Sequence, residues 1–287
     1  MEKAEILFES YNMAVEESFN KIFTENKSHD LLNIEDENIK QHLAADLEKW
    51  ANTPIGELDG ISPADYFKNI EDIAQLLELF RLAAKLCDND IPDPLTDRLK
   101  AFYESAVNGL LELITDESIL YNDEDQIISL MAIRTIGKWK AASSLEPLIK
   151  LLDSIREDSE IVVEEICGAL VQLGENSANR IIEILSESSI NSLEEYLLDS
   201  LVKIGITIKD RNLYDKIFRT IKSTFNKMEN KIFGAICLGN FGDGRAIPAL
   251  RGFVEKNKNT IDYETFLEIK SSVHRLGGNM DDIEIRF

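Results

Sequence analysis

The chain has 287 residues, of which 44% are hydrophobic, and it carries 53 acidic against 31 basic residues, a net charge of −22. This length is enough to bury a continuous core, but no stretch reaches the ~18 to 20 apolar residues of a membrane-spanning helix. The first residues are acidic where a secretory signal peptide is basic, so we expect a cytoplasmic protein with no membrane partner.

Two long amphipathic helices are predicted at the start of the chain. Apolar residues recur at three- and four-residue spacing from Ala4 to Ile22, and again from Ile39 to Trp50. This spacing places them on one face of a helix. The second helix is expected to end before residues 53–63, an ordered loop whose hydrophobic residues should contact the neighbouring helices.

Two further helices follow in the N-terminal part. Ser62 precedes Pro63 and stands three residues before Asp65, which together predict a capped helix start, and the apolar pattern continues to Ala84. A fourth helix is predicted from residues 93–94 to about residue 114. The polar cluster at 122–125 then introduces a different pattern.

Charge separates residues 1–125 from the rest. They hold 29 acidic and 10 basic residues, a net of −19, whereas residues 126–287 have a net of only −3. We therefore interpret residues 1–125 as an acidic N-terminal helical module. Its field repels nucleic-acid phosphate and anionic lipid. A solvated surface with no binding role is the alternative interpretation.

A short pattern recurs five times in residues 126–287. Each copy ends in a glycine, with an apolar residue one and four positions earlier and a small residue five positions earlier. The glycines are Gly137, Gly174, Gly205, Gly242 and Gly277, at spacings of 37, 31, 37 and 35 residues. Such periods are typical of helix pairs repeated along a solenoid.

The helical period puts the positions one, four and five before each glycine on one stripe, which we expect to be buried. The small residue lets a neighbouring helix approach closely. The glycine is predicted to take the left-handed conformation that ends the helix, so that a second helix can follow.

Two stretches carry a family resemblance. Residues 132–137, Ala-Ile-Arg-Thr-Ile-Gly, and residues 238–250, Leu-Gly-Asn-Phe-Gly-Asp-Gly-Arg-Ala-Ile-Pro-Ala-Leu, resemble HEAT-like repeats, the second stretch in the form first described in phycobilisome lyases. The resemblance spans about residues 126 to 280. It implies an all-α solenoid of antiparallel helix pairs, with about five units in 126–287, the last incomplete. It also implies a concave face that binds a protein or nucleic acid.

Basic residues gather within the repeats. From Lys203 to Lys258 there are 12 basic and 5 acidic residues. We predict that part of this set binds an acidic segment of a partner protein, or the acidic N-terminal half of a second copy. An ordinary solvated helix face is the alternative. The candidate partner-binding residues are Lys209, Lys216, Arg219, Lys222, Lys227, Arg245 and Arg251.

No catalytic or metal-binding motif is present in the sequence, and no cofactor is expected. His29, His42 and His274 lack a second ligand at metal-binding spacing. Cys87, Cys167 and Cys237 are isolated from one another, and Cys237 occupies a small-residue position of the repeat, which predicts burial.

The leading hypothesis is a non-catalytic interaction scaffold that uses a solenoid groove and the basic residues. The alternative is an enzyme or enzyme accessory of the HEAT-like lyase type, acting on a bound protein or small molecule; it would require a pocket with converging ionisable groups. Nucleic-acid binding ranks third, because the overall charge opposes it. The sequence leaves open the oligomeric state and whether the N-terminal helices extend the stack or cover its groove.

Overall fold

A computed structural model describes residues 2–25, 36–156, 159–186 and 193–285. Within these ranges the chain forms sixteen α-helices, three short 3₁₀ helices and no strand, so the all-α prediction is confirmed. No described helix is long and apolar enough to cross a membrane. The chain divides into two compact units, residues 1–139 and 140–287, which we call unit 1 and unit 2.

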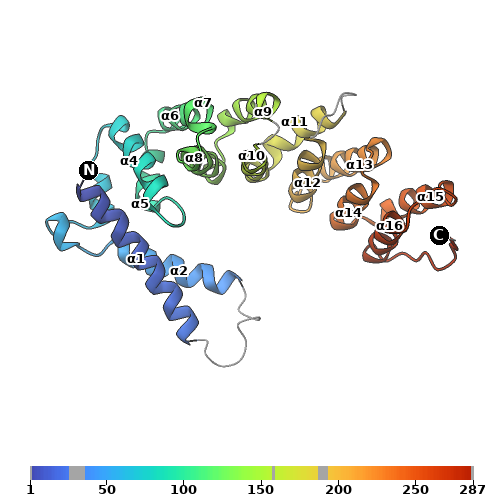
Figure 1. Cartoon of the computed structure of the whole chain (residues 1–287), viewed down its shortest axis with the longest axis horizontal. Coiled ribbons are helices and arrows are strands. Elements are labelled where there is room, and N and C mark those ends of the chain that lie inside the picture. The colour runs from blue at the N-terminus through green and yellow to red at the C-terminus, as the bar shows by residue number, and fades with distance from the viewer. Residues whose placement is uncertain (1, 26–35, 157–158, 187–192, 286–287) are drawn as a thin grey trace. The chain divides into compact units, whose positions relative to one another are not determined.

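Unit 1 contains eight α-helices and one 3₁₀ helix in its described residues (Figure 1). They are α1 (Glu2–Glu25), α2 (Asp36–Ala51), η1 (Gly56–Leu58), α3 (Pro63–Lys68), α4 (Ile73–Leu86), α5 (Asp93–Lys100), α6 (Glu104–Thr115), α7 (Glu117–Leu120) and α8 (Gln126–Trp139). The two long N-terminal helices were therefore predicted correctly.

The core of unit 1 forms where α1 packs on α2 and α4, and where α8 packs on α4 and α6. Phe8 and Phe67 are fully buried, with ring centroids 6.4 Å apart. The loop 53–63 is ordered as predicted, because Leu58 is buried and η1 contacts α1.

The predicted third helix is two helices. Its start is correct, since the Ser62 hydroxyl accepts a hydrogen bond from the Asp65 amide. The single helix expected through Ala84 is wrong, however: α3 ends at Lys68, and the Asp72 carboxylate caps the new helix α4 by accepting from the Ala74 amide at 3.0 Å. A side-chain cap inside an apolar pattern restarts the helix at a new angle.

The predicted fourth helix is also two helices, so the described part of the chain has seven α-helices before α8 where about four were expected. The break between α5 and α6 falls at residues 101–103, where Tyr103 takes a φ of 50°. This conformation is rare outside glycine and interrupts the helix without a sequence signal.

Unit 2 contains the other eight described α-helices, in pairs. They are α9 (Leu145–Ser154), α10 (Glu160–Leu173), α11 (Glu175–Ser186), α12 (Glu194–Gly205), α13 (Arg211–Lys227), α14 (Lys231–Phe241), α15 (Ile247–Lys256) and α16 (Tyr263–Arg275), with η2 (Ala142–Ser144) and η3 (Gly244–Ala246) before α9 and α15. Helices α10, α12, α14 and α16 pack in series as one layer, and α11 packs on α13 in the other (Figure 1).

The repeated stripe is buried as predicted. At the position five before each glycine, all five small residues are at most 2% exposed, and at the position four before, all five aliphatic residues are 0% exposed. One position before the glycine, Ile136, Leu173, Ile204 and Phe241 are buried and Leu276 is half-buried. Small residues thus allow close helix contact where the pattern places them.

The glycines themselves behave in two ways. Gly174, Gly242 and Gly277 end helices with positive φ, and Gly242 has the predicted left-handed conformation, whereas the ψ of −123° at Gly174 lies outside it. Gly137 and Gly205 lie within α8 and α12, so the left-handed prediction is wrong for these two as well. At Gly205 the reason for glycine is space, because an added Cβ would lie 2.5 Å from Cε2 of Phe241.

The boundary between the two units, at 139/140, and the predicted module boundary, at 125/126, differ by one helix. Helix α8 carries the first copy of the repeat pattern, yet it packs on α4, α6 and α7 of unit 1. The predicted boundary at 125/126 marks where the repeat pattern begins in the sequence, and it stays a prediction.

Candidate functional site

Helix α13 carries most of the predicted binding residues. It begins because the Asp210 carboxylate accepts hydrogen bonds from the amides of Asn212 and Leu213, at 2.7 and 3.0 Å. Its buried side includes Leu213, Ile217 and Ile221, spaced by four. An aliphatic stripe of this kind leaves the opposite side of the helix to solvent.

The opposite side of α13 is basic. Lys216 and Arg219 are exposed and Lys222, three residues further on, is half-buried. Residues three and four apart are neighbours on a helix surface, so the three charges lie together. Lys227 is exposed in the last turn, where a cation interacts favourably with the helix dipole, and exposed Lys209 precedes the cap. We call these five residues the α13 basic face.

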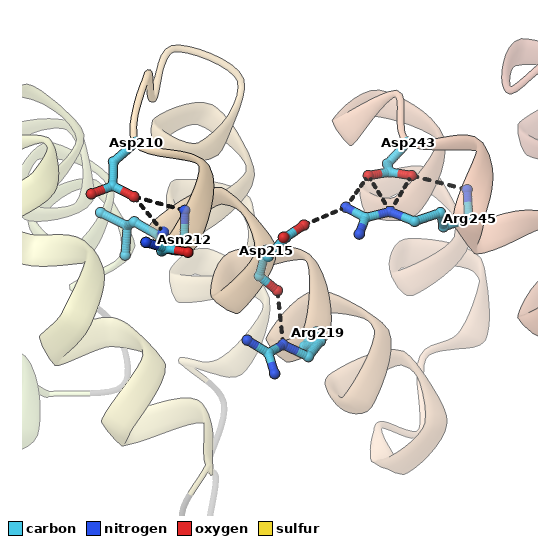
Figure 2. Close-up of polar contacts among 7 residues, drawn as sticks. Asp210, Asn212, Asp215, Arg219, Asp243 and Arg245 are labelled. Carbon is cyan, nitrogen blue, oxygen red and sulfur yellow. Dashed lines mark hydrogen bonds and ion pairs between the residues drawn. The ribbon is translucent and has the colours of Figure 1, made fainter.

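The lysines of this face, Lys209, Lys216, Lys222 and Lys227, form no ion pair in the described ranges. The charge of Lys227 does act on Glu194, where it partly offsets the burial that raises the pKa of that carboxyl group. Arg219 donates from Nε to the carbonyl oxygen of Asp215 at 3.1 Å, which leaves the outer edge of its guanidinium toward solvent (Figure 2). The face therefore holds positive charge that no ion pair among the described residues neutralises.

Arg245 is engaged within the chain. Its guanidinium donates to both oxygens of Asp243 at 2.6–3.0 Å and forms an ion pair with Asp215 of α13 at 2.8 Å (Figure 2). It also stacks over the Phe218 ring, 4.4 Å from the centroid. The hydrogen bond from Arg245 lowers the pKa of Asp243 despite its burial. Arg245 thus joins α13 to the turn before α15, and we leave it out of the basic face.

Arg251 has an internal role of the same kind. It donates to both carboxylate oxygens of Asp282, at 3.0 and 2.6 Å, and to the carbonyl oxygen of Asn279. Glu255 lies 3.7 Å away, one turn along α15. These contacts hold the segment after α16 against α15, so Arg251 is also outside the basic face.

Polar side chains about one repeat apart touch along unit 2. These contacts are Arg180–Glu146 at 3.3 Å, Tyr196–Glu160 at 2.6 Å, Asn230–Glu195 at 2.8 Å and Arg275–Asn240 at 2.7 Å. The last three join residues 36, 35 and 35 positions apart, as Arg245–Asp215 joins residues 30 apart. The sequence repeat therefore reappears as a row of lateral contacts.

A groove of about 870 Å³ lies on the layer of unit 2 that α10, α12 and α14 form. Its floor includes Cys167, Gly168 and Ser200 from α10 and α12. Its walls carry four carboxylates and two lysines: Glu160, Glu164, Glu195, Asp199, Lys140 and Lys203. None of the seven predicted binding residues lines it. The groove and the α13 basic face are separate surfaces with opposite predominant charge.

The sequence contained one weak signal for this groove. Gly168 lies in the middle of α10, where glycine weakens a helix relative to alanine by about 1 kcal/mol. No atom lies within 4 Å of the place where its Cβ would be. Gly252 in α15 has equally open space and does not line the groove, so a glycine within a helix does not by itself locate such a surface.

The cysteines and histidines, for which the sequence predicted no catalytic or metal-binding role, are not part of the α13 basic face. All three cysteines are buried, which confirms the prediction for Cys237, and burial raises the pKa of the Cys87 thiol to about 12. His42 and His274 are exposed, and His29 lies outside the described residues. In the described ranges no three His, Cys, Asp or Glu residues are grouped to hold a metal ion.

Comparison with protein-family models and with curated proteins gave no match for this chain.

Proposed function

We propose that the protein is a non-catalytic interaction scaffold, an α-solenoid of HEAT-like helix pairs that binds an acidic segment of a partner protein on the α13 basic face. The observation that carries the proposal is the set of lysines on this face that form no ion pair among the described residues.

The repeat architecture is supported by two independent features. Alternate helices of unit 2 pack in series, and polar contacts join side chains about one repeat apart. Stacked helix pairs that contact only their neighbours have this pattern. Such an array presents long side surfaces, which suit the binding of a partner segment.

Some of the surrounding cations are engaged within the chain, whereas Arg211, Lys256 and Lys258, like the α13 lysines, form no ion pair in the described ranges. Lys203 pairs with Asp199, and Lys231 donates to the carbonyl oxygens of Phe225 and Asn226 at the end of α13. Arg245 and Arg251 are paired within the chain. A partner with acidic residues at matching spacing would neutralise the lysines of the α13 basic face.

The expected interaction is electrostatic and sensitive to salt. Individual exposed ion pairs contribute about 0–1 kcal/mol each, so several charges must act together. Screening at physiological ionic strength acts over about 8 Å. Binding through this face should therefore weaken as salt rises.

The test is a triple charge reversal, Lys216→Glu, Arg219→Glu and Lys222→Glu. The probe is a labelled peptide of alternating Glu and Ala, about eight residues long, whose extended length matches the ~25 Å of α13. Fluorescence anisotropy at low salt should show binding to the natural chain and binding at least about ten-fold weaker to the variant.

A matched control keeps the net charge of the variant but leaves α13 intact. It reverses Lys100, Lys150 and Lys256, which are exposed and lie on other helices. Equal weakening by both triple variants would contradict the proposal, because net charge alone would then explain binding. Circular dichroism of each variant verifies that the helices are retained.

Two further measurements distinguish the identity of the partner. If the acidic segment belongs to a second copy, sedimentation should show a dimer that the α13 variant alone disrupts. If a double-stranded RNA competes with the peptide at physiological salt, the acidic-segment proposal is overturned in favour of phosphate binding.

A further inference from the structure

Unit 1 contains a cavity that the scaffold function does not use. It measures about 590 Å³ and lies among α1, α2, α3 and α5. Its apolar lining includes Leu47 and Trp50 of α2 and Pro94 of α5. This volume is within the range of about 300–1,000 Å³ found for small-molecule sites.

Tyr11 of α1 lines this cavity with an unpartnered hydroxyl. The residue is only 4% exposed, and its ring meets Trp50 edge-to-face with centroids 5.2 Å apart. The indole Nε1 of Trp50 donates to the Ser10 hydroxyl at 3.0 Å, so this neighbour is satisfied. Among the described residues, nothing hydrogen-bonds the Tyr11 hydroxyl.

A buried tyrosine hydroxyl usually has a hydrogen-bond partner. Tyr11 also lines a neighbouring cavity of about 500 Å³, which shares Ala44, Leu47 and Asp93 with the first. Burial raises the pKa of Tyr11 above its ordinary range, so its hydroxyl stays protonated and can both donate and accept. The Tyr11 hydroxyl is not among the fully buried unsatisfied atoms of the described residues, so it is accessible from the cavity and can hydrogen-bond a bound molecule or water.

The ionisable lining of the cavity favours a cation. Asp93 and Asp97 are one turn apart on α5, and Glu48 lines the same cavity from α2; all three residues are exposed at its mouth. Partial burial raises the pKa of Asp93, and the charges of Asp97 and Asp90 add to this effect while Lys138 opposes it. No ion pair is formed by the three lining carboxylates within the described ranges.

The lining carries two basic residues, Arg98 and Lys68, against its three carboxylates, so its formal charge is −1. Arg98 donates to the carbonyl oxygen of Ile70 from Nε at 2.9 Å and from Nη2 at 2.7 Å, and its guanidinium lies 4.9 Å from the Phe102 centroid. Lys68, the other lining cation, is exposed. Residues 1–125 as a whole add a net charge of −19.

We propose that this cavity binds a small organic cation, whose ammonium group pairs with Asp93 and Asp97, whose apolar body packs against Trp50 and Leu47, and which hydrogen-bonds the Tyr11 hydroxyl. The site is independent of the α13 basic face, because its lining comes from unit 1 alone.

Three probes with the same ring and different charge test the proposal on the full-length chain. They are phenethylammonium, neutral 2-phenylethanol and anionic 3-phenylpropionate. Calorimetry at about pH 7 should give binding of the cation at least about ten-fold tighter than that of the alcohol, and none of the anion. Equal binding of all three, or no binding of the cation at about 10 mM, would overturn the proposal.

Variants then locate the site. Asp93→Asn and Asp97→Asn should each weaken phenethylammonium binding about ten-fold, and Tyr11→Phe about three-fold. Glu104→Gln on α6 is the matched control, since Glu104 is exposed, belongs to unit 1 and lines neither cavity. Two separate aspartate variants keep the test decisive if one fails to fold. Loss of binding in Glu104→Gln to the same extent would place the cation elsewhere.

Discussion

Gly205, the last residue of α12, leaves room for the helices that follow it. A Cβ at this position would lie 2.5 Å from Cε2 of Phe241 and 2.9 Å from Cγ2 of Ile217. Both neighbours are buried, with exposures of 4% and 0%, so neither can move aside easily. The repeat pattern revealed this glycine, but only the packing shows that it provides space and not a turn.

Gly205→Ala is expected to destabilise the chain by about 1–3 kcal/mol, because the added methyl group overpacks a buried contact. Chemical denaturation monitored by circular dichroism measures this free energy of unfolding. The control is Gly252→Ala in α15, where no atom lies within 4 Å of the Cβ position. There alanine should stabilise by about 0.5–1 kcal/mol. An unchanged stability of the Gly205 variant would show that the contact can relax.

Individual basic residues illustrate how much of the candidate site the sequence predicts. Composition and spacing predicted a basic surface on the second helix of the third repeat, and four of the predicted residues lie on α13; their binding role stays a prediction. They could not separate the α13 lysines from Arg245, because the Asp215 carboxylate that pairs with Arg245 is 30 residues away. A side chain's partner across a fold is set by packing, which a local pattern does not encode.

At the scale of the helix, α13 depends on its cap. The Asp210 carboxylate satisfies two amides that the first turn leaves without a helical partner. If it is removed, the first turn should fray, and the position of Lys209 relative to the rest of the basic face should change.

Asp210→Ala is therefore expected to cost about 1 kcal/mol of stability, whereas Asp210→Asn, which preserves the cap, should remain within a few tenths of that of the natural chain. Thermal unfolding measures both variants. The alanine variant should also bind the acidic peptide more weakly than the asparagine variant. A loss shared by both variants would mean that the charge of Asp210, and not its hydrogen bonds, supports the helix.

The helix start at Ser62 was predictable because a capping residue adjoins a proline there, whereas the start at Asp72 was missed because its cap lies inside an apolar pattern. The end of α3 is associated with a distant contact, since Arg98 donates to the carbonyl oxygen of Ile70 in the break. The break before α6 depends on the backbone of Tyr103. Both interruptions lie inside continuous apolar patterns, which alone predict one helix.

At the scale of the whole molecule, charge is the dominant asymmetry. Most of the net charge of −22 belongs to residues 1–125. Like charges repel and destabilise a compact state, and added salt screens the repulsion. The stability of the chain should therefore rise between low and physiological salt.

We expect the melting temperature to increase by about 2–4 °C between low and physiological salt. Neutralising three exposed glutamates of α1, Glu9→Gln, Glu16→Gln and Glu17→Gln, should reduce this increase. Neutralising Asp153, Glu164 and Glu229 in unit 2 should change it less, because those residues lie in the nearly balanced part of the chain. An equal response of the two triple variants would show that the repulsion is not confined to the acidic part.

The row of lateral contacts in unit 2 has a consequence for how such a chain changes in evolution. Each contact in the row joins a helix pair only to the next one, as Glu160 joins Tyr196 and Glu195 joins Asn230. The contacts differ in residue type, so a duplicated pair would face its own copy: Asn240, which accepts from Arg275, would meet a second Asn240. Gain or loss of a whole helix pair therefore requires new polar partners at one junction only, whereas insertion of a few residues within a pair would misalign the row.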